Sequence, residues 1–196
     1  QPNNSSNITL WKNKVGLTNY NLSNVNNYAT YKTNGISNLN SIYLNNTGLT
    51  ASVPSGTFSS ALSVFIVYKN INTIRTTASL FYRTNNSNTA LPINIFNKNR
   101  VFSNGIQTNT YNAGYDVRSS SSNIFYFNAN SSKSYNEYIN GTIGTNISNT
   151  TYYSDTGSKI SIGIDGTNSV TAGLVGDISE ILIFLALQQI YKYILY

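Results

Sequence analysis

The sequence predicts an all-β protein whose strands pack as an antiparallel β-sandwich of the jelly-roll type. Apolar segments of five to eight residues recur along the chain, separated by clusters of Asn, Gly and Ser. Several of these segments alternate between apolar and polar residues, which is the period of a strand with one buried face. Many short strands without intervening helices favour a sandwich over an α/β architecture.

The expected strands are rich in β-branched and aromatic residues, the types that pack well on a pleated sheet. Leu62–Tyr68 is the clearest example, and Lys159–Ile164 alternates strictly between polar and apolar residues. In chain order, the expected strands are Ser41–Leu44, Leu62–Tyr68, Ala78–Arg83, Pro92–Phe96, Val101–Phe102, Tyr115–Arg118, Asn123–Asn128, Lys159–Ile164 and Asp177–Phe184.

Asn-Gly pairs mark the expected tight turns. Asn140-Gly141 lies between the strand-like segments Glu137–Ile139 and Thr142–Ile143. It predicts a two-residue type I′ hairpin, because Asn and Gly both tolerate a positive φ. The other candidates for the same turn are Asn34-Gly35 and Asn104-Gly105.

A single domain is expected over residues 10–196, because neither an internal repeat nor a change of composition divides this part of the chain. Residues 1–9 are rich in Asn and Ser and are interpreted as a flexible leader. Leu187–Tyr196 changes to a helical apolar period, which predicts a short C-terminal helix. The longest apolar run, Ile181–Leu187, is far below the roughly 20 residues that cross a bilayer, so no membrane insertion is expected.

The composition excludes several kinds of site. Because the chain contains no His, Cys or Met, it offers no zinc, haem or iron–sulfur site built on His or Cys, no Ser-His-Asp triad and no disulfide. Its twelve Lys and Arg are scattered, so the net charge of +6 does not predict nucleic-acid binding. The polar surface is built from Asn, Ser, Thr and Tyr, which is typical of secreted or virion-exposed proteins.

The few acidic residues do not predict a catalytic pair. A retaining glycosidase needs two carboxyl groups about 5 Å apart. Asp177 and Glu180 are the only acids close in sequence, and three residues apart in a strand they are expected on opposite faces. Glu180 is interpreted as a structural carboxylate that accepts hydrogen bonds from a neighbouring loop or Lys. The chain is therefore expected not to be an enzyme.

The order of these segments resembles the concanavalin A-like lectin/glucanase superfamily, in the laminin-G-like jelly-roll branch seen in virion surface proteins. The resemblance covers nearly all of residues 10–196. The segments that carry it are Trp11, Ser41–Gly48, Val64–Lys69, Tyr138–Gly141, Ile162-Gly163, Gly176–Phe184 and Tyr193–Tyr196.

The resemblance implies a binding role, and sugars are held by amide and carboxylate hydrogen bonds together with aromatic surfaces. Calcium at the sandwich rim is a further implication, for which Asp155 and Asp116 are the candidate ligands with loop asparagines. The alternative is that the Tyr- and Asn-rich loops are solvated turns. The candidate glycan-binding residues are Tyr82, Arg83, Asn85, Tyr111, Asp116, Tyr152 and Asp155.

The expected function is that of a non-enzymatic domain on a virion surface, capsid-associated or used for attachment, that contacts a glycan or a cell-surface receptor. Its other expected partners are neighbouring virion subunits. The alternatives are a structural capsid or decoration protein without a ligand, and a secreted bacterial adhesin. In each of these cases the domain is expected on a virion surface or outside a cell.

Overall fold

The computed structural model describes residues 6–12, 22–25, 29–53, 62–70, 77–84, 91–96, 100–103, 107–110, 122–129, 135–143, 159–164 and 174–184. Within these ranges the chain forms strands, turns and bends. No helix of the length and apolarity needed to cross a membrane occurs in this part of the chain.

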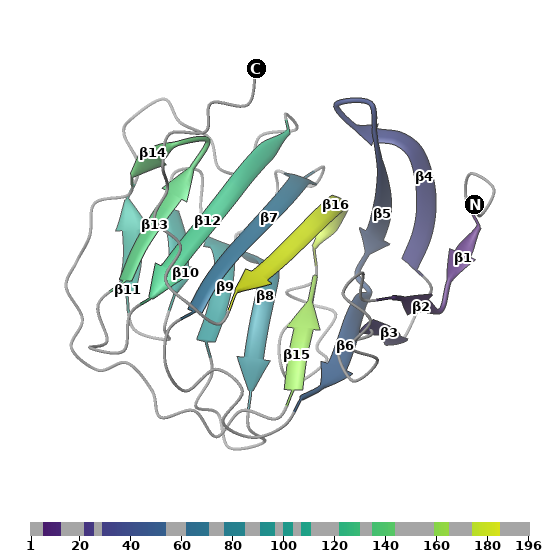
Figure 1. Cartoon of the computed structure of the whole chain (residues 1–196), viewed down its shortest axis with the longest axis horizontal. Coiled ribbons are helices and arrows are strands. Elements are labelled where there is room, and N and C mark those ends of the chain that lie inside the picture. The colour runs from purple at the N-terminus through teal and green to yellow at the C-terminus, as the bar shows by residue number, and fades with distance from the viewer. Residues whose placement is uncertain are drawn as a thin grey trace.

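In the described part of the chain, sixteen strands form two sheets of eight strands each (Figure 1). Sheet A has the order β1 (Asn7–Ile8), β4 (Ala29–Ile36), β5 (Leu39–Asn45), β16 (Val175–Phe184), β7 (Leu62–Asn70), β12 (Asn123–Ala129), β13 (Tyr135–Ile139) and β14 (Thr142–Ile143). Sheet B has the order β11 (Gln107–Thr110), β10 (Arg100–Ser103), β9 (Leu91–Phe96), β8 (Thr77–Thr84), β15 (Lys159–Ile162), β6 (Gly48–Ser52), β3 (Leu22–Val25) and β2 (Leu10–Trp11).

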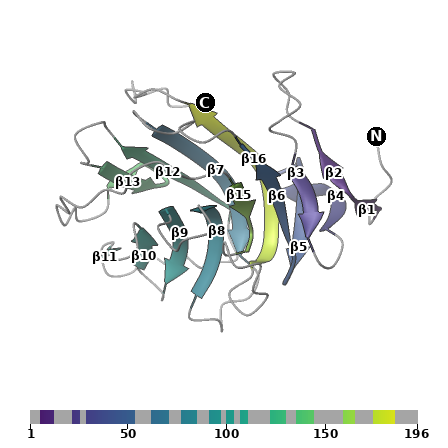
Figure 2. The ribbon, with the colours of Figure 1, turned by 90° about the horizontal axis from the view of Figure 1, so that it is seen from below.

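The two sheets stack face to face, and every described strand pair is antiparallel. In Figure 1 the strands β7, β12 and β16 of sheet A lie in front of β8, β9 and β10 of sheet B, and Figure 2 shows the two layers from below. The prediction of an antiparallel β-sandwich is confirmed. The expected C-terminal helix over residues 187–196 lies outside the described residues.

The core fills the space between the sheets with alternate residues of both. Burying a large apolar side chain contributes roughly 1.5–3 kcal/mol, so this layer is the main source of stability. Trp11, the expected opening aromatic residue, is half-buried against it. The buried cluster consists of Ala29, Ile42, Leu44, Leu49, Val53, Val64, Ile66, Tyr68, Phe125, Ile139, Ile160, Ile162, Leu174 and Ile178.

The expected strands that fall within the described ranges are present, most of them one or two residues longer than the alternation predicts. The exception is Lys159–Ile164, which is a strand only to Ile162 and then bends. Tyr115–Arg118 lies outside the described residues. Part of the expected leader is structured, because Asn7 and Ile8 form β1 and pair with Thr30 and Ala29 of β4.

The Asn140-Gly141 hairpin is confirmed. Asn140 has a φ of 50° and Gly141 a φ of 79°, and the flanking residues Ile139 and Thr142 pair directly. These are the two left-handed positions that a type I′ turn requires. The register of β13 and β14 therefore follows from the turn chemistry of the sequence.

The hairpin expected at Asn34-Gly35 is wrong. The turn between β4 and β5 is at Ser37 and Asn38, with φ of 46° and 66°, and Ile36 pairs with Leu39. Asn34-Gly35 instead lies within β4, in an irregularity between Lys32 and Ile36. Moving the turn later along the chain keeps the side chain of Ile36 buried at 1% exposure.

Candidate functional site

The face of sheet A that points away from sheet B is the candidate site, and it is called the outer face here. Ile66 of β7, Ile178 of β16 and Phe125 of β12 belong to the core, so their neighbours in each strand point outward. Paired residues of adjacent strands share a face. The outer face of the central strands therefore carries Ser63, Phe65, Val67 and Lys69 of β7, Ile124 and Tyr126 of β12, and Tyr138 of β13.

A β-bulge in β16 changes which residues reach this face. Asp177 lies opposite Lys69, whereas Glu180 lies opposite Val67, because the register shifts between Ile178 and Glu180. Lys69 and Val67 are two residues apart in one strand and share a face. Asp177 and Glu180 therefore both lie on the outer face, and the expectation that they lie on opposite faces is wrong.

The extra residue that causes this shift is Ser179, since a bulge places two residues of one strand against one of its partner. The sequence contains the signal, because the apolar residues Ile178 and Ile181 are three positions apart and break the period of two. After the bulge, Leu182 and Phe184 lie outward, opposite Phe65 and Ser63.

A polar cluster surrounds Asp177 at one end of the outer face. The Asp177 side chain is 3% exposed; its Oδ1 accepts a hydrogen bond from Ser41 Oγ at 3.1 Å and lies 3.4 Å from Lys32 Nζ. The same Nζ lies 3.7 Å from the centroid of the Tyr43 ring. The ammonium group is thus held between a carboxylate and an aromatic face. These four residues, Lys32, Ser41, Tyr43 and Asp177, are called the Asp177 cluster.

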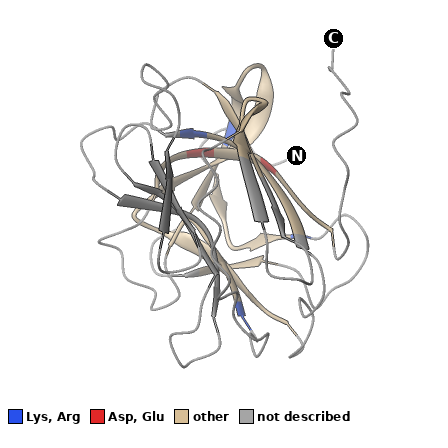
Figure 3. Cartoon of the chain, turned by 90° about the vertical axis from the view of Figure 1, so that its left-hand side faces the viewer, with Lys and Arg blue, Asp and Glu red and all other residues tan. Residues whose placement is uncertain are grey.

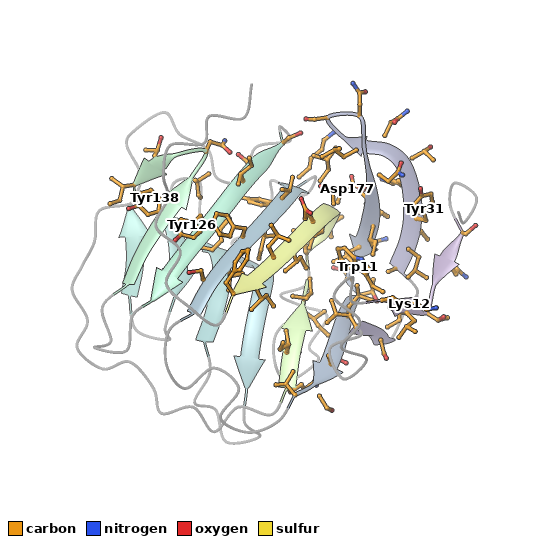
Figure 4. All side chains as sticks on the ribbon, viewed as in Figure 1. Trp11, Lys12, Tyr31, Tyr126, Tyr138 and Asp177 are labelled. Atoms are coloured by element: carbon orange, nitrogen blue, oxygen red, sulfur yellow. The ribbon has the colours of Figure 1, made fainter. Side chains whose placement is uncertain are left out.

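An aromatic row crosses the outer face from β16 to β13. Tyr126 stacks on Phe65 at a centroid distance of 4.1 Å and on Tyr138 at 5.6 Å, and Phe184 meets Phe65 edge to face at 6.0 Å. The row therefore runs Phe184, Phe65, Tyr126, Tyr138 across β16, β7, β12 and β13. Figure 4 shows Tyr126 and Tyr138 side by side and Asp177 toward the other end of the sheet.

The centre of the row is buried. Tyr126 is 3% exposed, and burial raises the pKa of its phenol. A hydrogen bond with the Ser63 side chain acts in the opposite direction, and the neighbouring Tyr138 raises the pKa further. The Tyr126 hydroxyl is thus stabilised in its neutral form.

Exposed apolar side chains lie in the row and beside it. Ile124 is 47% exposed, Ile143 53%, Leu182 41% and Phe184 37%. Ile143 lies opposite Tyr138, and Ile124 lies opposite Val67, so all four belong to the outer face. Of the six large apolar side chains that are exposed in the described part of the chain, four gather here; the others are Leu10 and Leu39.

Of the residues named from the sequence as glycan-binding, two fall in a described strand. Tyr82 and Arg83 lie in β8 of sheet B, where they pair with Ser161 and Ile160. Their side chains are not described. The other candidates, Asn85, Tyr111, Asp116, Tyr152 and Asp155, lie outside the described residues. The expected calcium ligands Asp155 and Asp116 are among them, and the described residues contain no group of three acidic residues that could hold a metal ion.

The chemistry of the outer face was missed because its members come from distant strands. Ser41 and Asp177 are 136 residues apart in sequence. Figure 3 shows that charged positions are few and scattered over the described strands, so the pairing of Lys32 with Asp177 stands out. Glu180, the expected partner of a Lys, is half-buried on the same strand.

No protein-family model matches the chain, and no curated protein matches it in sequence. Solved structures match its fold. A sialidase from Trypanosoma rangeli, in complex with 2,3-difluoro-KDN, aligns with a TM-score of 0.69 at 8% identity over 95% of this chain. The aligned part is 30% of the sialidase, so this chain spans less than a third of its length.

Two smaller structures align over most of their own length. Domain 4 of a GH43 extracellular arabinanase from Geobacillus stearothermophilus, in complex with arabinotriose, has a TM-score of 0.58 at 16% identity, over 84% of this chain and 78% of the other. The CBM40 domain of the Ruminococcus gnavus IT-sialidase, bound to α2,3-sialyllactose, has a TM-score of 0.54 at 16% identity, over 68% and 80%. These likenesses agree with the expected concanavalin A-like jelly roll, and at this identity they concern the fold alone.

Proposed function

We propose that this domain is a non-enzymatic, lectin-like module that contacts glycans with the outer face of sheet A. The fold is similar to that of domains solved with arabinotriose and with sialyllactose. A fold does not determine a function, so the proposal depends on the chemistry of the face.

The observation that carries the proposal is the bulge in β16. Because of it, one strand presents Glu180 on the outer face beside the exposed side chains of Leu182 and Phe184. Sugar recognition combines hydrogen bonds to hydroxyl groups with contacts between C–H groups and apolar or aromatic surfaces. Glu180 supplies the acceptor, and Lys69 on the adjacent strand supplies a donor.

The same geometry supports a role without catalysis. A glycosidase needs one carboxyl group as a general acid and a second as base or nucleophile. Asp177, the carboxylate nearest to Glu180 in sequence, is engaged by Ser41 and Lys32 and is almost completely buried. Its environment suits a structural anion, so Glu180 remains without a catalytic partner on its own strand.

A glycan array tests the proposal, followed by calorimetry with the best ligand. Glu180→Gln and Phe184→Ala are expected to weaken binding at least about tenfold, the loss of roughly one hydrogen bond to a charged group or one apolar contact. Leu39→Ala is the matched control, because Leu39 is 52% exposed at the tip of the β4–β5 hairpin. Absence of binding to every sugar at millimolar concentration would refute the proposal.

A second candidate is a structural subunit that packs against its neighbours through the outer face. The specific observation in its favour is the gathering of Ile124, Ile143, Leu182 and Phe184 on one face. Exposed apolar patches mark interaction sites more often than chance. Here the variants Ile143→Lys and Leu182→Lys are expected to abolish assembly, measured by light scattering.

The proposed setting is a virion surface or another extracellular surface, with a glycan or cell-surface receptor as partner. Neighbouring virion subunits are the partners of the structural alternative, and a secreted bacterial adhesin is a third possibility. The support is compositional: only 9% of residues are charged and the surface is rich in amides and hydroxyls. Rim calcium at Asp155 and Asp116, and glycan contacts at Tyr82 and Tyr152, remain predictions.

A further inference from the structure

Asn-Gly pairs are chemically labile, and this chain contains three of them. The backbone nitrogen of the glycine attacks the side-chain Cγ of the asparagine, and the Cγ–Nδ2 bond breaks. Ammonia leaves with the proton from the glycine nitrogen, and the ring that results is a succinimide. Water then opens the ring to aspartate or isoaspartate. The reaction needs an asparagine side chain that is free to rotate toward the following nitrogen.

Asn34 meets this requirement. It is exposed, and within the described part of the chain no hydrogen bond to its carboxamide is present. Its backbone is also outside the regular ladder, because Lys32 pairs with Ser41 and Ile36 with Leu39, leaving three residues of β4 against one of β5. The Asn34 side chain is therefore not held by a hydrogen bond to another described residue.

The packing of the hairpin explains why this labile pair stands here. A Cβ atom on residue 35 would collide with Ser41 Oγ and lie 2.9 Å from Ser41 Cβ, so only glycine fits against the hydroxyl that bonds Asp177. Asn34 has a φ of 55°, a left-handed conformation that asparagine adopts more readily than most residues. Packing against Ser41 requires glycine at position 35, and the left-handed backbone favours asparagine at position 34. Together these two requirements account for the Asn-Gly sequence.

Asn140 is also followed by glycine, but its side chain is held by hydrogen bonds. Its Oδ1 accepts a hydrogen bond from the backbone N–H of Ile124 at 2.7 Å, and its Nδ2 donates to Asn123 Oδ1 at 3.1 Å. Its own N–H donates to the Ile124 carbonyl at 2.9 Å. The carboxamide is therefore clamped onto β12, although the residue is exposed. Rotation toward Gly141 would break both side-chain bonds.

We propose that Asn34 is a site of spontaneous deamidation in the folded protein and that Asn140 is protected by its hydrogen bonds to β12. Conversion of Asn34 adds a carboxylate two residues from Lys32, the cation that pairs with Asp177. The formal net charge then falls from +6 to +5. This inference is independent of the proposed glycan binding.

The experiment compares the two sites in one molecule. The folded chain is incubated at about pH 8 and 37 °C, digested, and analysed by peptide mass mapping, with isoaspartyl methyltransferase to report isoaspartate. Breaking two hydrogen bonds predicts conversion at Asn140 that is at least about tenfold slower than at Asn34. In urea, where neither site is held, the two rates are expected to converge.

Two variants complete the test. Asn34→Gly keeps the left-handed conformation and is expected to remove the first acidic species seen by isoelectric focusing. Asn123→Ala removes the acceptor of Asn140 Nδ2 and is expected to accelerate conversion at Asn140. Equal rates at the two sites in the folded chain would overturn the proposal, and so would faster conversion at Asn140. Absence of aspartate and isoaspartate at residue 34 in the peptide map would also overturn it.

Discussion

The two ends of the outer face are stabilised in different ways. The aromatic row is built from residues that lie directly opposite one another, Phe65 with Tyr126 and Tyr126 with Tyr138, so strand pairing alone brings the rings together. In the Asp177 cluster, side chains of β4, β5 and β16 meet, although neither Lys32 nor Ser41 is directly paired with Asp177. The comparison teaches that the stacked rings follow from direct strand pairing, whereas the ion pair joins Lys32 and Asp177, which lie on strands that are not neighbours in the sheet.

Tyr126→Ala gives the largest expected effect at the aromatic end. The ring is 3% exposed and lies between two other rings, so its removal leaves a cavity. A loss of about 3 kcal/mol in the free energy of unfolding is expected, measured by urea denaturation. The control is Ile124→Ala on the same strand and face, where a 47% exposed side chain should cost less than about 1 kcal/mol. Similar losses in the two variants would contradict the assignment of Tyr126 to a buried row.

Asp177→Ala should have the next largest effect, at the polar end. It removes the acceptor of the Ser41 hydroxyl and the partner of Lys32, and leaves the buried Ser41 without that bond. The expected loss is about 2 kcal/mol, because hydrogen bonds to a buried charged group are among the stronger ones. A double-mutant cycle with Ser41→Ala measures the coupling, and a coupling near zero would show that the two side chains do not interact.

Lys32→Met is expected to lower the free energy of unfolding less than Asp177→Ala does. The Lys32 side chain is 35% exposed, so water and salt screen its pair with Asp177. We expect a loss of at most about 1 kcal/mol, which shrinks further as salt is added to wild type and variant. Lys12→Met is the control, because Lys12 is exposed and lies outside the cluster. Equal salt dependence in both variants would argue against the ion pair.

High pH is expected to destabilise the aromatic end through Tyr126, and this is the smallest of the expected effects. Burial raises the pKa of Tyr126 above its ordinary value of 10.0, so the folded state favours the neutral phenol. The stability this provides is fully present below about pH 10 and is lost as the pH rises through the folded-state pKa. Thermal unfolding of wild type and Tyr126→Phe from pH 8 to pH 11 measures it. The variant should lose less stability in the alkaline range, and identical profiles would contradict the prediction.

Much of sheet A could be predicted because its strands carry local signals. Alternation identified Leu62–Tyr68 and Asn123–Asn128, and the Asn140-Gly141 turn fixed the register of β13 and β14. The candidate site could not be predicted in the same way. Alternation assumes an unbroken period of two, and Ser179 breaks it within β16.

By itself the sequence determined the all-β class, most strand positions and one hairpin, because these depend on neighbouring residues and on backbone preferences. Only the tertiary structure decided which residues share the outer face. The pairing of Lys32 and Ser41 with Asp177, and the placing of Glu180 beside Leu182, depend on strand order and on one extra residue in a strand. A one-residue shift moves every following side chain to the other face, and no local pattern fixes where distant strands meet.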